Sequence, residues 1–472
     1  MNYKWLALSN TTIGTLMASL DRNIVIIALP SIANELHTSL ITLVWIAIGY
    51  WVVTASMLLT FGRLADMFGR VKLYNLGFAL FTIGSGLCCV SQTGEQLIVF
   101  RIIQALGAAF IFSNSSAILS DSFPESERGK ALGINQISIV VGSVMGLVIG
   151  GALTSYFGWR SIFWINIPIG IFATVWAFSK LKELGTIKKE KIDWLGNLLF
   201  AGGLISILLG ITFGSFHLLN IFEITLFILV GISLLVLFYK NEKKVSFPMM
   251  DLSLFKLRLF TSSNIAIFFN SLARGAFTFV MVFFLQGPTM LLNPLESGIY
   301  LIPVSLALAI VAPITGWFYD KYRSQIISQT GLIISAIGFI LLATLGSRIS
   351  YADAILPLAL IGAGLGIFTS PNRATIMNSV PPNRRGVAAG ISTTLVMAGS
   401  AFSIGLVFLI FSALLPAEVV VVLFSGSTNS THQDSIQFND ADLDRFILSI
   451  HGIFIISAVL MVISVLIQRK MK

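Results

Sequence analysis

Long apolar runs dominate this chain and recur about every 25 to 35 residues, separated by short polar segments. A run of 18 or more mostly apolar residues is long enough to cross a bilayer core of about 30 Å as a helix. The pattern predicts fourteen such helices, near residues 5–30, 40–61, 73–90, 97–118, 131–153, 161–178, 194–213, 219–239, 262–286, 296–315, 325–345, 354–376, 390–414 and 447–467. We therefore expect an all-α polytopic membrane protein.

Basic residues are distributed unevenly between the gaps that separate these helices. Only 11% of the 472 residues are charged, and 24 of the 30 Lys and Arg fall in one alternate set of gaps. Three lie in the other set, and three lie inside helices. Because Lys and Arg accumulate on the cytoplasmic side, both termini are predicted to be cytoplasmic, in the plasma membrane. The net charge of +9 is spread over short loops, so it does not indicate nucleic-acid binding.

The first helix and one outer gap differ from the rest of the pattern. Only Lys4 precedes the first apolar run, which contains Asp21 and Arg22, so a retained helix is favoured over a cleaved signal peptide. Outer gaps are short except near 415–446, where a polar, Asp-containing stretch is predicted to be a solvated loop. Asn429 in that loop begins a glycosylation acceptor sequence, which matters only if the host glycosylates that face.

Part of the chain is repeated at a nearly constant offset. Gly62 and Asp66 follow the second helix, and Gly316 and Asp320 follow the tenth, at an offset of 254 residues. A second pattern, Arg-Gly-x-Ala-x-Gly, begins at 128 and again at 385, an offset of 257. The offset spans eight helices, so the two copies share one orientation, as in a parallel repeat about an axis along the membrane normal.

The repeat predicts how the chain is divided. We expect an N-terminal six-helix bundle in residues 1–180, basic loops and two inserted helices in 181–258, and a C-terminal six-helix bundle in 259–472. Parallel repeats of this kind place the transport site at their interface, near the bilayer midplane.

Several segments carry a family resemblance. They read Gly62-x-Leu-x-Asp66-x-x-Gly69-Arg70-x-Lys72, Leu20-Asp21-x-x-Ile-Val-x-x-Ala-Leu-Pro30, Arg101-Ile-Ile-Gln104-Ala-Leu-Gly107, Gly142-x-x-x-Gly146-Leu147-x-x-Gly150-Gly151 and Trp159-Arg160-Ser-Ile-Phe-Trp-Ile-Asn166-Ile-Pro168. Together they resemble the fourteen-helix drug:proton antiporter branch of the major facilitator superfamily, more strongly in the first half than in the second.

The resemblance implies a major-facilitator fold that exports lipophilic compounds, often cations, in exchange for protons. No cofactor beyond the proton gradient is then expected. The chain departs from the family at Leu147, where the fifth-helix motif usually has Pro. It departs again at Arg22 and Asn23, where the branch commonly has an uncharged residue and Thr.

Asp21 is the candidate proton-carrying residue. It lies about nine residues before Pro30, near the bilayer middle at roughly 1.5 Å per residue. A charged Asp there costs on the order of 2.5 to 3.5 kcal/mol, so it is expected to face a cavity and to have a partner or a proton. Arg101 is the expected partner. Two alternatives remain: Asp21 is a structural residue capped by neighbouring hydroxyls and amides, or Arg101 extends to the outer interface.

Two loops are predicted to form a conformational latch. Three bases in the first loop would already serve as a cytoplasmic anchor, but its two glycines and its recurrence favour a further role. Asp66 can cap backbone amides or bind a base across the half in one access state. Neither Asp66 nor Arg70 is expected to reach the central cavity. The predicted latch residues are Gly62, Asp66, Gly69, Arg70, Lys72, Gly316 and Asp320.

A glycine stripe marks the fifth helix. Gly142, Gly146 and Gly150 recur every fourth residue, and Gly151 follows directly. Such small residues allow close approach of a neighbouring helix. We expect this stripe to pack at the interface between the two halves.

Basic residues inside helices bear on the substrate. Arg274 lies about twelve residues into the ninth helix, one turn beyond Asn270, and up to three cavity bases face one acid. We therefore expect poor transport of permanent dications and better transport of neutral or anionic amphiphiles, unless Arg274 forms a structural ion pair in its own half. The candidate cavity residues are Arg22, Asn23, Gln104, Asn270 and Arg274. Hydrophobic cargo would suit Phe277, Phe279, Phe283 and Phe284 on the same helix.

Other function classes have little support. The four His are scattered, no Gly-rich phosphate loop is present, and adjacent Cys88 and Cys89 read as small core residues. An enzyme, a metal site and ATP-driven transport are therefore not expected, and no ring of like residues suggests a channel. The expected partners are a small-molecule substrate, protons and the lipid bilayer, with no nucleic acid, and the protein is expected to be a monomer. A specific anionic or zwitterionic metabolite, taken up or exported, is the alternative substrate.

Overall fold

The computed structural model describes residues 3–185, 191–287, 289–322, 324–346, 350–381, 384–416, 419–420 and 440–470. Every regular element in these residues is helical: α1 (Tyr3–Leu36), α2 (Leu40–Phe68), α3 (Arg70–Cys89), α4 (Gly94–Ser122), α5 (Glu125–Phe157), α6 (Ser161–Trp164), α7 (Asn166–Lys180), α8 (Trp194–Ser215), α9 (Ile221–Glu242), η1 (Leu252–Lys256), α10 (Arg258–Gln286), α11 (Pro294–Tyr300), α12 (Ile302–Tyr322), α13 (Gln325–Ala343), α14 (Tyr351–Asn378), α15 (Arg385–Leu414) and α17 (Asp440–Lys470). Fourteen helical segments are long and apolar enough to cross a membrane, with α6 and α7 forming one of them. The prediction of an all-α fold with fourteen spans is confirmed. Asn429 lies outside the described residues.

Short polar sequences set where several helices begin. Asn220 and Glu223 form a capping box at the start of α9, in which each side chain accepts a hydrogen bond from the other's backbone N–H. Asn293 and Glu296 do the same at the start of α11. These caps satisfy N–H groups that have no partner within the helix, so the chain can turn sharply at the membrane boundary.

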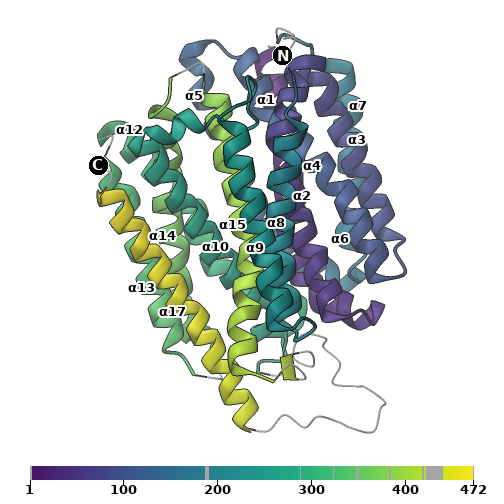
Figure 1. The fold of residues 1–472 in the computed structure, drawn as a ribbon, viewed down its shortest axis with the longest axis vertical. Helices are drawn as coiled ribbons and strands as arrows, with labels where there is room; N and C mark the ends of the chain where they lie inside the picture. Colours follow the sequence, from purple (N-terminus) through teal and green to yellow (C-terminus); the bar gives the residue numbers. More distant parts are fainter. Residues whose placement is uncertain are drawn as a thin grey trace.

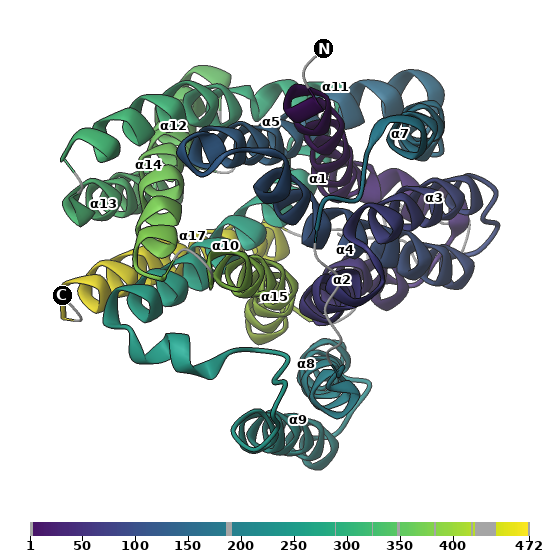
Figure 2. The same cartoon turned by 90° about the horizontal axis from the view of Figure 1, so that it is seen from above.

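Two groups of helices pack around a central axis (Figures 1 and 2). The first group is α1 to α7, in which α1 packs on α5, and α4 on both α2 and α3. The second is α10 to α17, in which α14 packs on α12 and α13, and α10 on α15 and α17. Helices α8 and α9 pack on each other at the periphery, where α8 contacts both α2 and α15. This packing is compatible with the proposed division into 1–180, 181–258 and 259–472.

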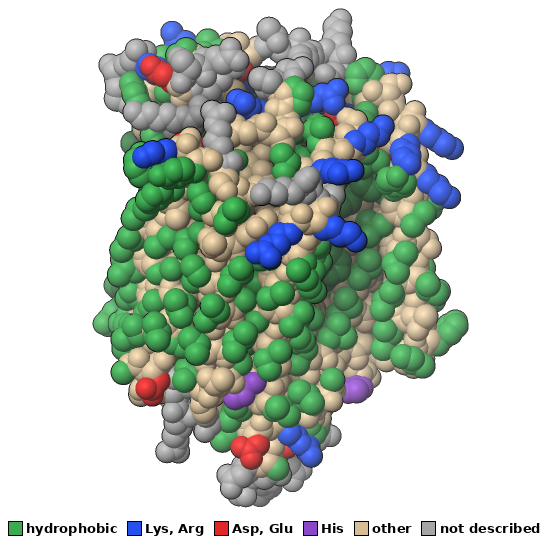
Figure 3. Space-filling model, turned by 90° about the vertical axis from the view of Figure 1, so that its left-hand side faces the viewer, with side chains coloured by type: hydrophobic (Ala, Val, Ile, Leu, Met, Phe, Trp, Pro, Cys, Tyr) green, Lys and Arg blue, Asp and Glu red, His purple; other side chains and the backbone are tan. Residues whose placement is uncertain are grey.

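Charge separates the two ends of the bundle. Figure 3 shows Lys and Arg gathered at the upper end, above a broad hydrophobic belt. The chain begins at this end in Figure 1, and the C-terminus also lies toward it. We call it the basic end. Cys88 and Cys89 are both buried, in agreement with their prediction as core residues.

The connection after α9 is tied to helices on both sides. The Glu242 carboxylate accepts a hydrogen bond from the backbone N–H of Met250 at 2.7 Å. Arg63 on α2 donates to the carbonyl oxygens of Phe247 and Pro248, each at 2.6 Å. These bonds hold the segment beside the basic end of α2.

The glycine stripe of α5 packs inside the first group of helices. A Cβ on Gly142 would lie 2.5 Å from the carbonyl oxygen of Leu16, and one on Gly146 would lie 2.7 Å from that of Leu20. Gly150 lies against the side chains of Ile24 and Ile27 on the same helix, α1, at 2.6 and 2.7 Å from an added Cβ. The stripe therefore allows α1 to lie against α5, and the prediction that it packs between the two halves is wrong.

Gly151 is the exception. It faces away from α1 and lies against the backbone of Pro294, the first residue of α11. Consecutive residues on a helix point in directions that differ by about 100°. Gly151 therefore faces a different helix from the stripe of Gly142, Gly146 and Gly150. Gly151 alone of the four glycines contacts the second group.

We expect Gly142→Ala to destabilise the protein by about 1–3 kcal/mol, because the new methyl group would overlap backbone that cannot move independently. The matched control is Gly133→Ala on the same helix, where nothing lies within 4 Å of the added Cβ. That substitution should be neutral or stabilising by up to about 1 kcal/mol, since Ala favours helix over Gly. Thermal unfolding of the detergent-purified proteins measures both. Equal stability of the two variants would contradict the close packing of α1 on α5.

Candidate functional site

Asp21 lies in a closed network of polar side chains in the middle of the N-terminal helices. It is fully buried, and the Arg101 guanidinium on α4 donates to its Oδ2 at 2.5 Å. Gln104 and Asn166 donate amide N–H groups to Oδ1, at 2.9 and 2.8 Å. Ser85 accepts a second hydrogen bond from Gln104 at 2.8 Å. Arg101 is thus the partner of Asp21, as expected, and it does not extend to the outer interface.

Aromatic rings cover the other side of Arg101. Its guanidinium carbon lies 4.2 Å from the centre of the Tyr50 ring and 5.8 Å from that of Phe163. Cations are attracted to aromatic faces, so these rings stabilise the charge while excluding water. Asn166, which belongs to the motif at residues 159–168, supplies a third donor to the carboxylate.

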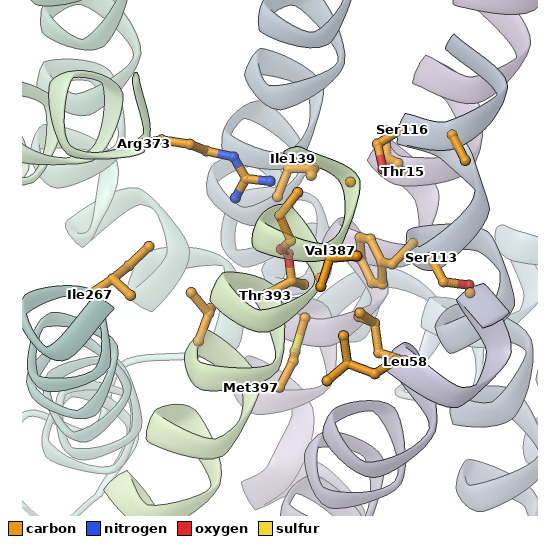
Figure 4. Close-up of a pocket in the computed structure, with 18 of the residues that line it drawn as sticks. Thr15, Leu58, Ser113, Ser116, Ile139, Ile267, Arg373, Val387, Thr393 and Met397 are labelled. Atoms are coloured by element: carbon orange, nitrogen blue, oxygen red, sulfur yellow. Dashed lines mark hydrogen bonds between the residues drawn. The ribbon is translucent and has the colours of Figure 1, made fainter. Parts of the chain in front are cut away.

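A cavity of about 490 Å³ lies between the two groups of helices. Side chains from α1, α2, α4, α5, α10, α14 and α15 line it, and Figure 4 shows part of this lining, including Thr15, Ser113, Ile267 and Met397. It reaches the basic end, where Arg63, Asp66, Arg70 and Asp251 also line it. Its volume lies within the range of small-molecule sites, roughly 300–1,000 Å³.

Contacts between the two groups close the opposite end. The backbone N–H of Leu295 on α11 donates to the Ser155 hydroxyl on α5 at 3.0 Å. The Gln286 amide donates to the carbonyl oxygen of Ile27 on α1, also at 3.0 Å. The structure is therefore open toward the basic end and closed at the other.

Asp21 and Gln104 do not line this cavity, although Asp21 was expected to face one and Gln104 was a candidate cavity residue. The reason is helix geometry. Asp21 faces α4 and α7, whereas Arg22, about 100° further around α1, lines the cavity. Asn23 is also absent from the lining, and its amide donates to the carbonyl oxygen of Ser143 at 2.7 Å.

Three arginines that have no acidic partner among the described residues line the cavity: Arg22, Arg274 and Arg373. Asn270 lines the cavity beside Arg274, so both candidates on α10 are placed there as predicted. Arg22 donates to the Ser143 hydroxyl at 2.7 Å and to the Met397 sulfur at 3.8 Å.

Arg373 was missed as a cavity residue. Counting bases per gap assigned it to a cytoplasmic loop, but α14 continues to Asn378 and carries Arg373 into the cavity. The predicted helix at 354–376 already contained it, which is the signal that could have found it. Arg101 was counted as the third cavity base and is instead paired with Asp21.

The phenylalanines of α10 do not form the cavity. Phe277, Phe279, Phe283 and Phe284 are buried in helix packing, with Phe277 against Phe339 and Phe279 against Phe408. None of the four lines the cavity, so the expectation that they contact cargo is wrong for this conformation.

Arg70 joins three elements at the mouth of the cavity. It pairs with Asp66, four residues earlier, and with Asp121 on α4, each at 2.7 Å. The Glu183 carboxylate accepts the backbone N–H groups of Arg70 and Val71 and so caps α3. Sequence reasoning missed Asp121 and Glu183, which lie far from the motif in the chain.

The expectation that Asp66 and Arg70 stay clear of the cavity is wrong, because both line its mouth, together with Gly62. Gly69 adopts φ 104°, a conformation that side chains disfavour, and this lets α2 turn directly into α3. Lys72 is exposed, and no salt bridge is found for it among the described residues.

The second copy of the motif has no matching network. Gly316 packs closely against the Ser370 hydroxyl, where an added Cβ would lie at 2.6 Å. Asp320 is exposed, and within the described part of the chain it forms no salt bridge. The structure therefore places the charged contacts of the predicted latch in the first copy alone, as far as the described residues extend.

Comparisons with known proteins agree with this architecture. The sequence profile of the Major Facilitator Superfamily matches residues 11–404. The chain is 34% identical over 403 residues to Riboflavin transporter RibZ of Clostridioides difficile, covering 84% of this chain and 85% of that one. It is 29% identical over 381 residues to Multidrug resistance protein 3 of Bacillus subtilis, covering 80% and 73%.

Solved structures share the fold. A bacterial homologue of the human lysosomal transporter Spinster, in an inward-facing and unoccupied conformation, superposes with a TM-score of 0.69 at 17% identity, covering 99% of this chain and 97% of that one.

We expect Arg70→Ala to slow substrate turnover by about tenfold, while the substrate dissociation constant changes less than twofold. These two half-buried ion pairs, together worth on the order of 1.4 kcal/mol, would produce that factor if α2 and α4 separate at the mouth in the other access state, so that the pairs stabilise this state alone. Asp121→Asn should slow turnover similarly, since it removes one of the same contacts. Lys72→Ala, which deletes an exposed charge in the same loop, is the control. Normal turnover combined with lost binding would show that Arg70 contacts substrate instead.

Proposed function

The chain belongs to the major facilitator superfamily, and we propose that it is a proton-coupled secondary active transporter that exports small amphiphilic molecules by alternating access. Its relatives are transporters, not enzymes. The observation that carries the proposal is the cavity between the two groups of helices, open at the basic end and closed at the other. A transporter in this conformation receives its substrate from the basic end, which the positive-inside rule assigns to the cytoplasm.

Proton coupling is assigned to Asp21 and Arg101. In this conformation Arg101 neutralises the buried Asp21 carboxylate at 2.5 Å. A conformation that separates the two would leave a buried carboxylate without a counter-ion, and proton uptake would then neutralise it. Movement of α1 relative to α4 would therefore load or release one proton per cycle, powered by the gradient.

The substrate class has two candidates. The first is multidrug or general amphiphile efflux, by analogy with relatives that include Multidrug resistance protein 3. The second is a specific anionic or zwitterionic metabolite, and the specific observation in its favour is the three arginines of the cavity. Riboflavin transporter RibZ, at 34% identity, is a relative named for one metabolite. In either case we place the protein in the plasma membrane, as a monomer with both termini in the cytoplasm.

We expect Asp21→Asn to abolish pH-gradient-driven transport while leaving expression and folding intact. Asn matches Asp in shape but carries no titratable proton. The measurement is substrate movement in proteoliposomes under an imposed pH gradient, with Asp320→Asn, which removes an exposed acid, as the matched control. Full pH-driven transport by Asp21→Asn would assign the coupled proton to another residue.

A further inference from the structure

We propose that Arg22, Arg274 and Arg373 form an anion-binding subsite in the central cavity, and that the transported molecule carries a carboxylate, a phosphate or a similar anionic group. This inference rests on the proposed function, because it assumes that the cavity is the transport site. It names the chemistry of the substrate, whereas the family resemblance alone would favour lipophilic cations.

The cavity lining carries more basic than acidic side chains. Among the described residues, the acids that line it are Asp66 and Asp251, both at the mouth. Each has a basic partner: Asp66 pairs with Arg70 at 2.7 Å, and Asp251 pairs with Arg384 at 3.1 Å. Neither carboxylate is therefore left to neutralise Arg22, Arg274 or Arg373.

None of the three arginines has an acidic partner among the described residues. Arg22 is 5% exposed, and its partners are a hydroxyl and a thioether, both neutral. Arg274 and Arg373 are half-buried, and within the described residues no hydrogen bond or salt bridge is found for either guanidinium. Arg22 and Arg274 carry the same charge and line the same cavity.

Such an arrangement is unfavourable without a counter-ion. Charges inside the membrane are expected to pair with each other or with a ligand, and three unpaired cations around one cavity strongly favour an anion within it. A guanidinium presents N–H groups in a planar fork that matches carboxylate and phosphate oxygens, so the bonds are both charge-assisted and directional.

The three arginines belong to helices of both groups. Arg22 comes from α1 in the first group of helices, whereas Arg274 and Arg373 come from α10 and α14 in the second. Figure 4 shows the Arg373 side chain extending from its helix toward Ile139. An anion held there contacts both groups at once. Without it, like charges face each other and oppose closure of the basic end.

Three matched ligands test the subsite: coumarin-3-carboxylate, the corresponding neutral carboxamide, and a coumarin that carries a trimethylammonium group. Equilibrium binding to the purified full-length protein is measured by fluorescence anisotropy. We expect the carboxylate to bind at least about tenfold more tightly than the carboxamide, and the cation most weakly.

Substitutions identify the residues responsible. Arg274→Gln and Arg373→Gln should each weaken carboxylate binding by about tenfold or more and leave carboxamide binding within about twofold. Arg373→Lys, which keeps the charge but loses the fork, should recover part of the affinity. The matched control is Lys240→Gln, which deletes an exposed charge on α9 far from the lining. Thermal unfolding of each variant excludes loss of fold as the cause.

Two outcomes would overturn the proposal. Equal losses for carboxylate and carboxamide in the arginine variants would mean that the arginines only support the cavity wall. Tighter binding of the cation by the unsubstituted protein would return the substrate class to lipophilic cations. Binding at equilibrium needs no proton gradient, so these results are independent of the Asp21→Asn experiment that tests proton coupling.

Discussion

A charged side chain inside a membrane needs a counter-charge or a proton, and the arrangement of this protein depends on how that requirement is met. At Asp21 it is met within the protein: Arg101, Gln104 and Asn166 donate three hydrogen bonds to one carboxylate, and aromatic rings cover the arginine. At Arg22, Arg274 and Arg373 in the central cavity, no described acidic side chain meets it. The first site is buried among its own partners, whereas the second lies in a cavity that is open at the basic end.

Much of the fold could be predicted from the sequence because the bilayer imposes a strong rule on every span. Length, apolarity and the alternation of basic loops were sufficient for fourteen helices, and the comparisons confirm the fold class. The pairing of Asp21 with Arg101 was also predictable, because two opposite charges in the apolar interior have few alternatives. The assignment of the proton to this pair stays a prediction.

What could not be predicted depends on the rotation of each helix about its own axis. Neighbouring residues on a helix differ in direction by about 100°, so a one-dimensional reading placed Asp21 and Arg22 in the same cavity when they face different partners. The same limit explains the glycine stripe: its spacing shows that some helix approaches closely, but not that the helix is α1. Arg373 was missed for a different reason: it lies within the predicted helix at 354–376 but was counted with the bases of the gap that follows.

Helix α1 connects the two charged sites. The Asp21–Arg101 pair lies wholly within α1 to α7, so rotation of one group of helices against the other as rigid bodies leaves it intact. Under the proposed proton coupling, loading and release of the proton would therefore require α1 to move relative to α4, and the glycines of α5 give α1 a smooth surface along which to shift. Arg22 is the residue through which the cavity can cause that movement. It contacts Ser143 on α5 and Met397 on α15, and an anion that draws it toward Arg274 and Arg373 pulls on the turn of α1 that also holds Asp21. Binding of an anionic substrate and protonation of Asp21 would then be coupled through one turn of α1, and no single residue would need to contact both the substrate and the proton.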